Sequence, residues 1–163
     1  MPKLEYSDLL KWFSQGEKLS KNWRIGTEHE KFVFYTNNLK RVSYLGASGI
    51  SELLNALAIK NNWVKIIENK NTIGLKDDTG ASISLEPGGQ LELSGTPLES
   101  LHQTCKETGQ HLKIIKEVMS GLGLSMVGVG YDPKWARSDI SFMPKGRYEI
   151  MKNYMPKVGQ LGL

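Results

Sequence analysis

Residues 83–94 constrain the fold more than any other part of this 163-residue chain. The run ISLEPGGQLELS alternates apolar and polar residues on both sides of a Pro-Gly-Gly turn, which is typical of a β-hairpin with one buried face. A three-residue loop, 87–89, pairs Glu86 with Gln90 and places all the apolar side chains on one face. A two-residue loop mixes apolar and polar residues on each face, so the sequence predicts the three-residue loop.

A second segment, 23–34, has a similar pattern. Its sequence WRIGTEHEKFVF predicts a strand in which Glu28 and Glu30 share one face, while His29 points to the other. The hairpin adds Glu86 and Glu92 on its polar face. Glutamate is a poor strand former, so four glutamates in β-prone segments suggest a functional site.

Converging carboxylates repel one another unless cations lie between them, and Mg²⁺ or Mn²⁺ prefers such oxygen ligands. We therefore interpret the four glutamates as a divalent-metal site, with a solvated sheet face as the alternative for either pair. His29 faces away from them, which favours a packed or surface histidine over a metal ligand.

These two segments, with the later runs VGYDPKW at 129–135 and MPKGRYEIMKNYMP at 143–156, resemble glutamate–cysteine ligase of the plant and proteobacterial type. The resemblance extends over residues 23–163. It implies an ATP-dependent ligase that activates the γ-carboxylate of glutamate as an acyl phosphate and joins it to cysteine. The product is γ-glutamylcysteine, in the first step of glutathione synthesis. The implied fold resembles part of the glutamine synthetase-like catalytic fold.

The resemblance assigns roles to single residues. The four glutamates match the family's acidic strand motifs and are expected to bind Mg²⁺ or Mn²⁺, with ATP as co-substrate. Arg147 is the expected catalytic and substrate-binding cation, because a planar guanidinium suits the carboxylate of an amino acid. Gln90, Tyr131 and Trp135 are the other expected substrate-binding residues.

Simpler interpretations stand beside these assignments. The alternative for Arg147 is a surface residue in the first turn of a helix. Tyr131 and Trp135 are equally consistent with core residues. The Gly88-Gly89 pair lacks both a following helix and the Lys-Ser/Thr of a P-loop, so a tight turn is favoured over a phosphate cradle.

The remaining pattern predicts an α+β domain, with an antiparallel sheet and helices packed on one face. The expected helices are 7–18 with Ser7 as N-cap and apolar residues Leu9, Leu10, Trp12 and Phe13, 48–60 opened by Ser48, 96–122 opened by Thr96 and Pro97, and 147–154 ended by Pro156. Further strands are expected at 63–68, 72–76 and 124–131. The longest helix is expected to pack on the sheet through a stripe of Leu98, Leu101, Cys105, Leu112, Ile115, Met119 and Leu122.

Composition excludes several classes of protein. With 39% hydrophobic and 23% charged residues, the chain is typical of a globular domain. No apolar run approaches the ~20 residues that span a bilayer, and the lysines behind the net charge of +4 are scattered, which does not favour nucleic-acid binding. The one cysteine, Cys105, excludes an internal disulfide; we predict a core thiol and a cytoplasmic protein.

Residues 1–163 are predicted to form a single domain. Enzymes that the chain resembles are several hundred residues long, so we expect the amino-terminal portion of a larger ligase domain, with the remainder missing. Three functions stay open: the amino-terminal part of a glutamate–cysteine ligase, a similar ligase with another amine acceptor, or a truncated non-catalytic domain that binds metal or nucleotide. The expected partners are small-molecule substrates, glutamate, cysteine and ATP, with no nucleic acid and no membrane.

Overall fold

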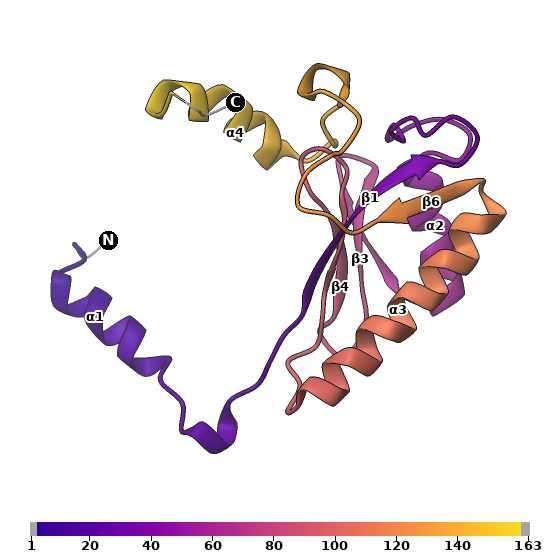
Figure 1. Ribbon diagram of the computed structural model, residues 1–163. Coiled ribbons are helices and arrows are strands. Elements are labelled where there is room, and N and C mark those ends of the chain that lie inside the picture. Colours follow the sequence, from indigo (N-terminus) through magenta and orange to yellow (C-terminus); the bar gives the residue numbers. More distant parts are fainter. Residues whose placement is uncertain (1–2, 161–163) are drawn as a thin grey trace.

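The computed structural model describes residues 3–160 and contains a six-stranded sheet, one side of which is covered by two of the helices (Figure 1). The strands are β1 (Glu28–Tyr35), β2 (Val64–Glu68), β3 (Asn71–Lys76), β4 (Ser82–Leu85), β5 (Leu91–Ser94) and β6 (Leu124–Val127). Their order is β2-β3-β4-β5-β1-β6, and every neighbouring pair is antiparallel. The predicted α+β class and antiparallel sheet are confirmed.

Helices α2 (Ile50–Asn61) and α3 (Leu101–Gly121) cover the apolar side of this sheet. The core lies between them and the strands, and its fully buried members include Leu53, Leu57, Leu75, Ile83, Leu85, Leu91 and Ile115. The predicted apolar spacing of α2 is confirmed. Its N-cap is Gly49 and not Ser48, because Ser48 has a positive φ of 60° and belongs to the preceding turn.

The start of the longest helix was predicted four residues too early. Ser100 is the N-cap of α3, and its side chain forms a capping box with Gln103. Thr96 and Pro97 instead belong to the connection from β5, in which Leu98 forms an isolated bridge with Ile25.

The predicted stripe of α3 was also wrong in its first half. The helix buries Thr104, His111, Ile115 and Met119, while Leu101 is 71% exposed. Cys105 is exposed and not a core thiol. The first buried residues of α3 are polar, Thr104 and His111. Because the prediction placed only apolar residues on the buried face, it chose the neighbouring positions Cys105 and Leu112 instead.

The first helix, α1 (Tyr6–Gln15), projects from the body on an extended connection (Figure 1). Glu5 is its N-cap, paired with Asp8, whereas Ser7 was predicted; the helix ends at Gln15 and not near Lys18. Its apolar residues Trp12 and Phe13 are 76% and 77% exposed. This helix therefore does not contribute to the core.

In the last part of the described chain, strand β6 and helix α4 end at residues other than those predicted. Strand β6 stops at Val127, before the glycines of the 128–131 segment, and not at Tyr131. Helix α4 (Gly146–Val158) keeps Pro156 within its final turn, where a proline was expected to end the helix. Among the helices of residues 3–160, none is long and apolar enough to cross a membrane.

Candidate functional site

The hairpin β4–β5 has the predicted three-residue loop. Leu85 pairs with Leu91 and Ser84 with Glu92, and the Glu86 N–H donates to Gln90 O at 3.0 Å. The turn closes with the Gly89 N–H donating to Glu86 O at 2.8 Å, with a φ of +81° that favours glycine. The hairpin therefore buries its leucines and keeps Glu86 and Glu92 on the opposite face.

Strand β1 brings its own glutamates to the same face. Glu30 is the cross-strand partner of Glu92, and Glu28 is the partner of Ser94. Glu92 is fixed between two hydroxyl groups, because Ser84 Oγ and Ser94 Oγ each donate to its carboxylate at 3.0 Å. The prediction that the four glutamates share one sheet face is confirmed, and we call Glu28, Glu30, Glu86 and Glu92 the acidic face.

Electrostatic repulsion within the acidic face is centred on Glu86. Burial raises the pKa of Glu86, and so do a hydrogen bond to Glu92 and the charges of Glu92 and Glu30, while Lys145 acts in the opposite direction. Within residues 3–160, no three His, Cys, Asp or Glu side chains are arranged to hold one metal ion by themselves. The protein thus supplies carboxylates in close pairs, and any bound cation needs further ligands.

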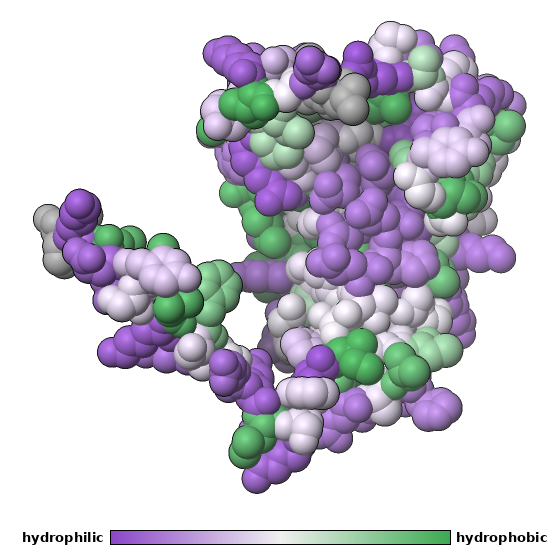
Figure 2. Space-filling model, turned by 60° about the vertical axis from the view of Figure 1, so that its left-hand side comes forward, coloured by the Kyte–Doolittle hydropathy of each residue, from purple (hydrophilic) through white to green (hydrophobic). Residues whose placement is uncertain are grey.

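The face turned away from α2 and α3 is hydrophilic over the middle of the body (Figure 2). On the other side of β1, Lys31 is buried against the core and its Nζ donates to His29 O at 2.5 Å. Burial lowers the pKa of Lys31 to about 8, although the charges of Glu92 and Glu30 raise it. His29 lies on this helix-covered side, as the alternation predicted.

The start of α4 adds positive charge beside the acidic face. Lys145 Nζ donates to Leu85 O at 2.8 Å and to Tyr148 Oη at 3.2 Å, and the Tyr148 hydroxyl also donates to Leu85 O. Arg147 donates to Tyr148 Oη at 3.1 Å. Its pKa is raised first by this hydrogen bond and by Tyr148, and also by the charges of Glu86 and Glu92. Arg147 is exposed, so its guanidinium is accessible to a ligand next to the carboxylates.

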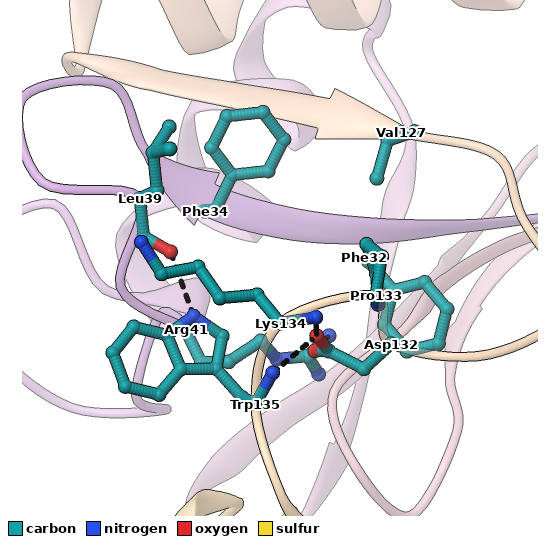
Figure 3. Close-up of a pocket in the computed structure, with 9 residues that line it drawn as sticks. All are labelled: Phe32, Phe34, Leu39, Arg41, Val127, Asp132, Pro133, Lys134 and Trp135. Atoms are coloured by element: carbon teal, nitrogen blue, oxygen red, sulfur yellow. Dashed lines mark hydrogen bonds and ion pairs between the residues drawn. The ribbon is translucent and has the colours of Figure 1, made fainter.

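An apolar pocket of about 200 Å³, which we call the aromatic pocket, adjoins the acidic face along β1 (Figure 3). Phe32 and Phe34 line it from the strand, and Trp135 closes it from the loop after β6. The Trp135 indole N–H donates to Leu39 O at 2.8 Å, which fixes the ring in the wall (Figure 3). Trp135 therefore lines this pocket, and its contact with substrate stays a prediction.

A buried ion pair supports this pocket. Arg41 and Asp132 lie 3.2 Å apart, and each side chain is only 9% exposed. Asp132 also accepts hydrogen bonds from the backbone N–H groups of Lys134 and Trp135, and Arg41 donates to Gly88 O in the hairpin turn. The pair thus ties the Trp135 loop to the turn that carries Glu86.

Two other predicted substrate residues occupy different environments. Gln90 lies within the hairpin, and its Oε1 is buried without a hydrogen-bond partner among the described residues. Tyr131 is 75% exposed and is not among the residues that line the aromatic pocket. The structure brings Gln90 and Arg147 toward the acidic face, while Tyr131 points into solvent.

Sequence reasoning missed Lys145, Tyr148, Arg41 and Asp132. The first two belong to the MPKGRY run that had been singled out, in which only the arginine was assigned a role. Arg41 and Asp132 are 91 residues apart and carry no local signal, because their meeting depends on the sheet order. Glu68 was also missed; its carboxylate accepts the Gly146 N–H at 2.6 Å and fixes the start of α4.

Relatives of known name match almost the whole chain. The chain is 55% identical over 160 residues to glutamate–cysteine ligase B, chloroplastic, of Oryza sativa subsp. japonica. It is 54% and 52% identical over the same length to the chloroplastic glutamate–cysteine ligases of Medicago truncatula and Arabidopsis thaliana. Each match covers 98% of this chain but only 30–32% of the relative, so the chain spans about a third of their length.

These relatives overturn the predicted cytoplasmic location, because they are chloroplastic enzymes. The prediction rested on a single cysteine. One cysteine excludes an internal disulfide in any compartment, so it does not identify the compartment in which a protein works.

A comparison with protein families gives a match to glutamate-cysteine ligase family 2 over residues 24–163. That range contains β1, the hairpin, the aromatic pocket and the start of α4. The match therefore includes every residue of the acidic face as well as Gln90, Trp135 and Arg147. The chain belongs to glutamate-cysteine ligase family 2.

Proposed function

We propose that this protein carries out ATP-dependent ligation of the γ-carboxylate of glutamate to the amine of cysteine, giving γ-glutamylcysteine. The observation that carries the proposal is the pairing of Glu30 with Glu92, beside Glu86, in a chain of this ligase family. Acyl phosphate formation and its attack by an amine both involve highly charged phosphoryl oxygens. A site of paired carboxylates suits metal-assisted chemistry of this kind.

The donor chemistry of the acidic face fits Mg²⁺ or Mn²⁺. Both ions prefer oxygen ligands, and Mg²⁺ is usually held by one or two carboxylates together with substrate phosphates. Burial and the charges of Glu92 and Glu30 raise the pKa of Glu86, and a bound cation would offset both effects by favouring the charged carboxylate. We assign Glu28, Glu30, Glu86 and Glu92 to the metal, whose contribution when bound is to neutralise and align the phosphate oxygens.

Positively charged and polar residues around this face are assigned to the substrates. Arg147 offers a planar guanidinium for the carboxylate of the amino acid. Gln90 Oε1, which is buried without a partner among the described residues, offers an acceptor for a donor on the substrate. Trp135 and the aromatic pocket give an apolar wall two to four residues along β1 from Glu30. Tyr131, which is exposed, stays a predicted substrate contact.

The likeness to the glutamine synthetase catalytic fold is part of the same proposal. Its support is the antiparallel sheet, which carries carboxylates on the face opposite the helices.

Two alternatives use the same site. The first is a ligase of this architecture with another amine acceptor, since no described residue of the site is specific for a thiol. The second is a non-catalytic domain that binds metal or nucleotide. The acceptor requirement of turnover separates the first alternative from our proposal, and turnover itself separates the second.

The test combines turnover with metal binding. Purified protein is mixed with ATP, glutamate and Mg²⁺, and phosphate release is followed with and without cysteine. Release that depends on cysteine supports the proposal, release that requires a different amine supports the first alternative, and absence of release with Mg²⁺ binding retained supports the second.

Metal binding is measured separately by titration calorimetry. Glu28→Gln and Glu86→Gln should each weaken Mg²⁺ binding by at least about tenfold, because each removes a proposed ligand charge. Glu17→Gln, at an exposed position outside the sheet, is the matched control and should leave the affinity unchanged. Unchanged affinity in both acidic-face variants would refute the metal assignment.

A further inference from the structure

Arg41 is a buried cation to which the assignments above give no part in the reaction. Its side chain is 9% exposed, and its Nη1 lies 3.2 Å from Oδ2 of Asp132 (Figure 3). Burial lowers the pKa of Arg41, whereas the charge and hydrogen bond of Asp132 raise it. A buried ion pair is weak evidence for stability, because desolvation offsets much of the attraction. The other contacts of Arg41 therefore indicate what the residue does.

The guanidinium of Arg41 is fixed on three sides. While Nη1 faces Asp132, Nη2 donates to Gly88 O. The guanidinium carbon lies 4.8 Å from the centre of the Phe32 ring, which is a cation–π contact. The backbone of Arg41 also forms an isolated antiparallel bridge with Phe34. The side chain is therefore anchored along β1 and extends from that strand to the hairpin turn.

The turn that accepts this hydrogen bond carries Glu86. Gly88 is two residues after Glu86, and the Gly89 N–H donates to Glu86 O at 2.8 Å. From a different segment, the Met143 N–H donates to Pro87 O at 2.9 Å. The turn is thus held from two directions, and a shift at Gly88 would move Glu86 with it.

The influence of Arg41 on Glu86 is one of position. The cation whose charge lowers the pKa of Glu86 is Lys145, which lies beside the acidic face. The charge of Arg41 is instead paired with Asp132. Loss of the Arg41 side chain would therefore change where the Glu86 carboxylate lies more than it would change the charge around it.

We propose that Arg41 is a positioning residue of the metal site, which keeps Glu86 beside Glu30 and Glu92 by holding Gly88 O. This inference rests on the proposed function, in which these carboxylates bind Mg²⁺. Groups that orient metal ligands contribute strongly to metal affinity, and their removal typically costs about 10–100-fold. Arg41 touches neither metal nor substrate and acts only through the turn.

The two oxygens of Asp132 allow the ion pair to be removed by itself. Oδ1 accepts the Lys134 and Trp135 N–H groups at 2.9 Å, while Oδ2 faces Arg41. Asp132→Asn keeps the first set of contacts and removes the charge. Arg41 is then a buried cation without its partner, so the thermal unfolding midpoint should fall. The contact with Gly88 O remains, so the affinity for Mg²⁺ should stay within about twofold of the parent chain.

The decisive variant combines Arg41→Met with Asp132→Asn. No buried charge remains at the pair, so the midpoint, measured without divalent ions, should recover toward that of the parent chain. The contact with Gly88 O is lost, so Mg²⁺ affinity by titration calorimetry should fall by at least about tenfold. A purely structural role would make affinity follow the midpoint, whereas a positioning role makes the two change in opposite order.

Arg41→Lys alone provides a second test that leaves the charge beside Asp132. A single ammonium nitrogen cannot occupy both positions of the guanidinium, so Mg²⁺ affinity should fall here as well. The matched control is Lys60→Met with Glu117→Gln. This ion pair also measures 3.2 Å but joins α2 to α3, on the side of the sheet away from the acidic face, and its removal should leave Mg²⁺ affinity unchanged.

The proposal is overturned if either Arg41 variant binds Mg²⁺ as tightly as the parent chain. It is also overturned if affinity falls in step with the midpoint across the series, or if the Lys60 and Glu117 control loses affinity equally. Those results would leave the metal assignment intact. A parent chain that binds no Mg²⁺ would instead refute the metal assignment, and this inference with it.

Discussion

The two faces of the β4–β5 hairpin are built from alternate residues of the same short strands, yet they have opposite effects on stability. Ile83, Leu85 and Leu91 are fully buried under α2 and α3. On the other face burial disfavours the charged form of Glu86, and the charges of Glu92 and Glu30 add to that penalty. The apolar face therefore stabilises the fold, whereas the close carboxylates of the acidic face lower the free energy of unfolding.

The sharpest way to test this contrast is to truncate one residue on each face. Leu85→Ala removes a fully buried side chain and should lower the free energy of unfolding by about 2–5 kcal/mol. Its neighbour change Ser84→Ala removes one hydrogen bond to Glu92 and should cost roughly 1 kcal/mol. Denaturant unfolding of both variants checks the difference, and equal losses would contradict the division between the faces.

A smaller effect is expected at the helix that covers the apolar face. Ser100→Ala removes the N-cap side chain of α3 and should cost about 1 kcal/mol, because the capping box loses the hydroxyl that accepts from the Gln103 N–H. Ser120→Ala, at an exposed position near the end of the same helix, serves as the control and should change stability very little. Thermal unfolding of the two variants distinguishes them; a loss for Ser120 equal to that for Ser100 would argue against the cap.

The smallest effect is a gain in stability on the acidic face. The pKa of Glu86 is raised, so the folded chain holds this proton at pH values where the unfolded chain has released it. The resulting stabilisation is complete below the ordinary value of 4.5 and is lost as the pH rises through the raised folded value. Glu86→Gln cannot ionise and should therefore become more stable than the parent chain across that interval.

The measurement is thermal unfolding from pH 4 to pH 8 without divalent ions. The difference in midpoint should grow with pH and then level off, while Glu17→Gln should show no such trend. A constant difference at all pH values would contradict the raised pKa of Glu86 in the folded state. The same variant is expected to lose Mg²⁺ affinity, so the two results together would separate stability from function at one residue.

The hairpin register and α2 could be predicted from sequence because local rules agree there. The alternation of apolar and polar residues, the odd number of residues in the loop and the glycines of the turn all specify the pairing of Glu86 with Gln90. In α2 the buried positions Leu53, Leu54 and Leu57 have the apolar spacing of a helix packed on one side. Each of these patterns is contained in a few consecutive residues.

The other predictions failed where a tertiary contact decides. Thr104 and His111 face the sheet although they are polar, and Cys105 is exposed although it is apolar in character. The Ser100–Gln103 capping box was a better local signal than Thr96 and Pro97 for the start of α3. The Arg41–Asp132 pair gave no local signal, because only the folded sheet brings the two residues together.

The Pro87–Gly89 turn has a consequence for changes in chain length. If the loop keeps its three-residue length, inserting or deleting a single residue there would exchange the partners across the hairpin, turning Glu92 into the leucine core and Leu91 outward. A change of two residues preserves the parity of the strands. Natural and engineered length variation at this turn should therefore occur in even steps.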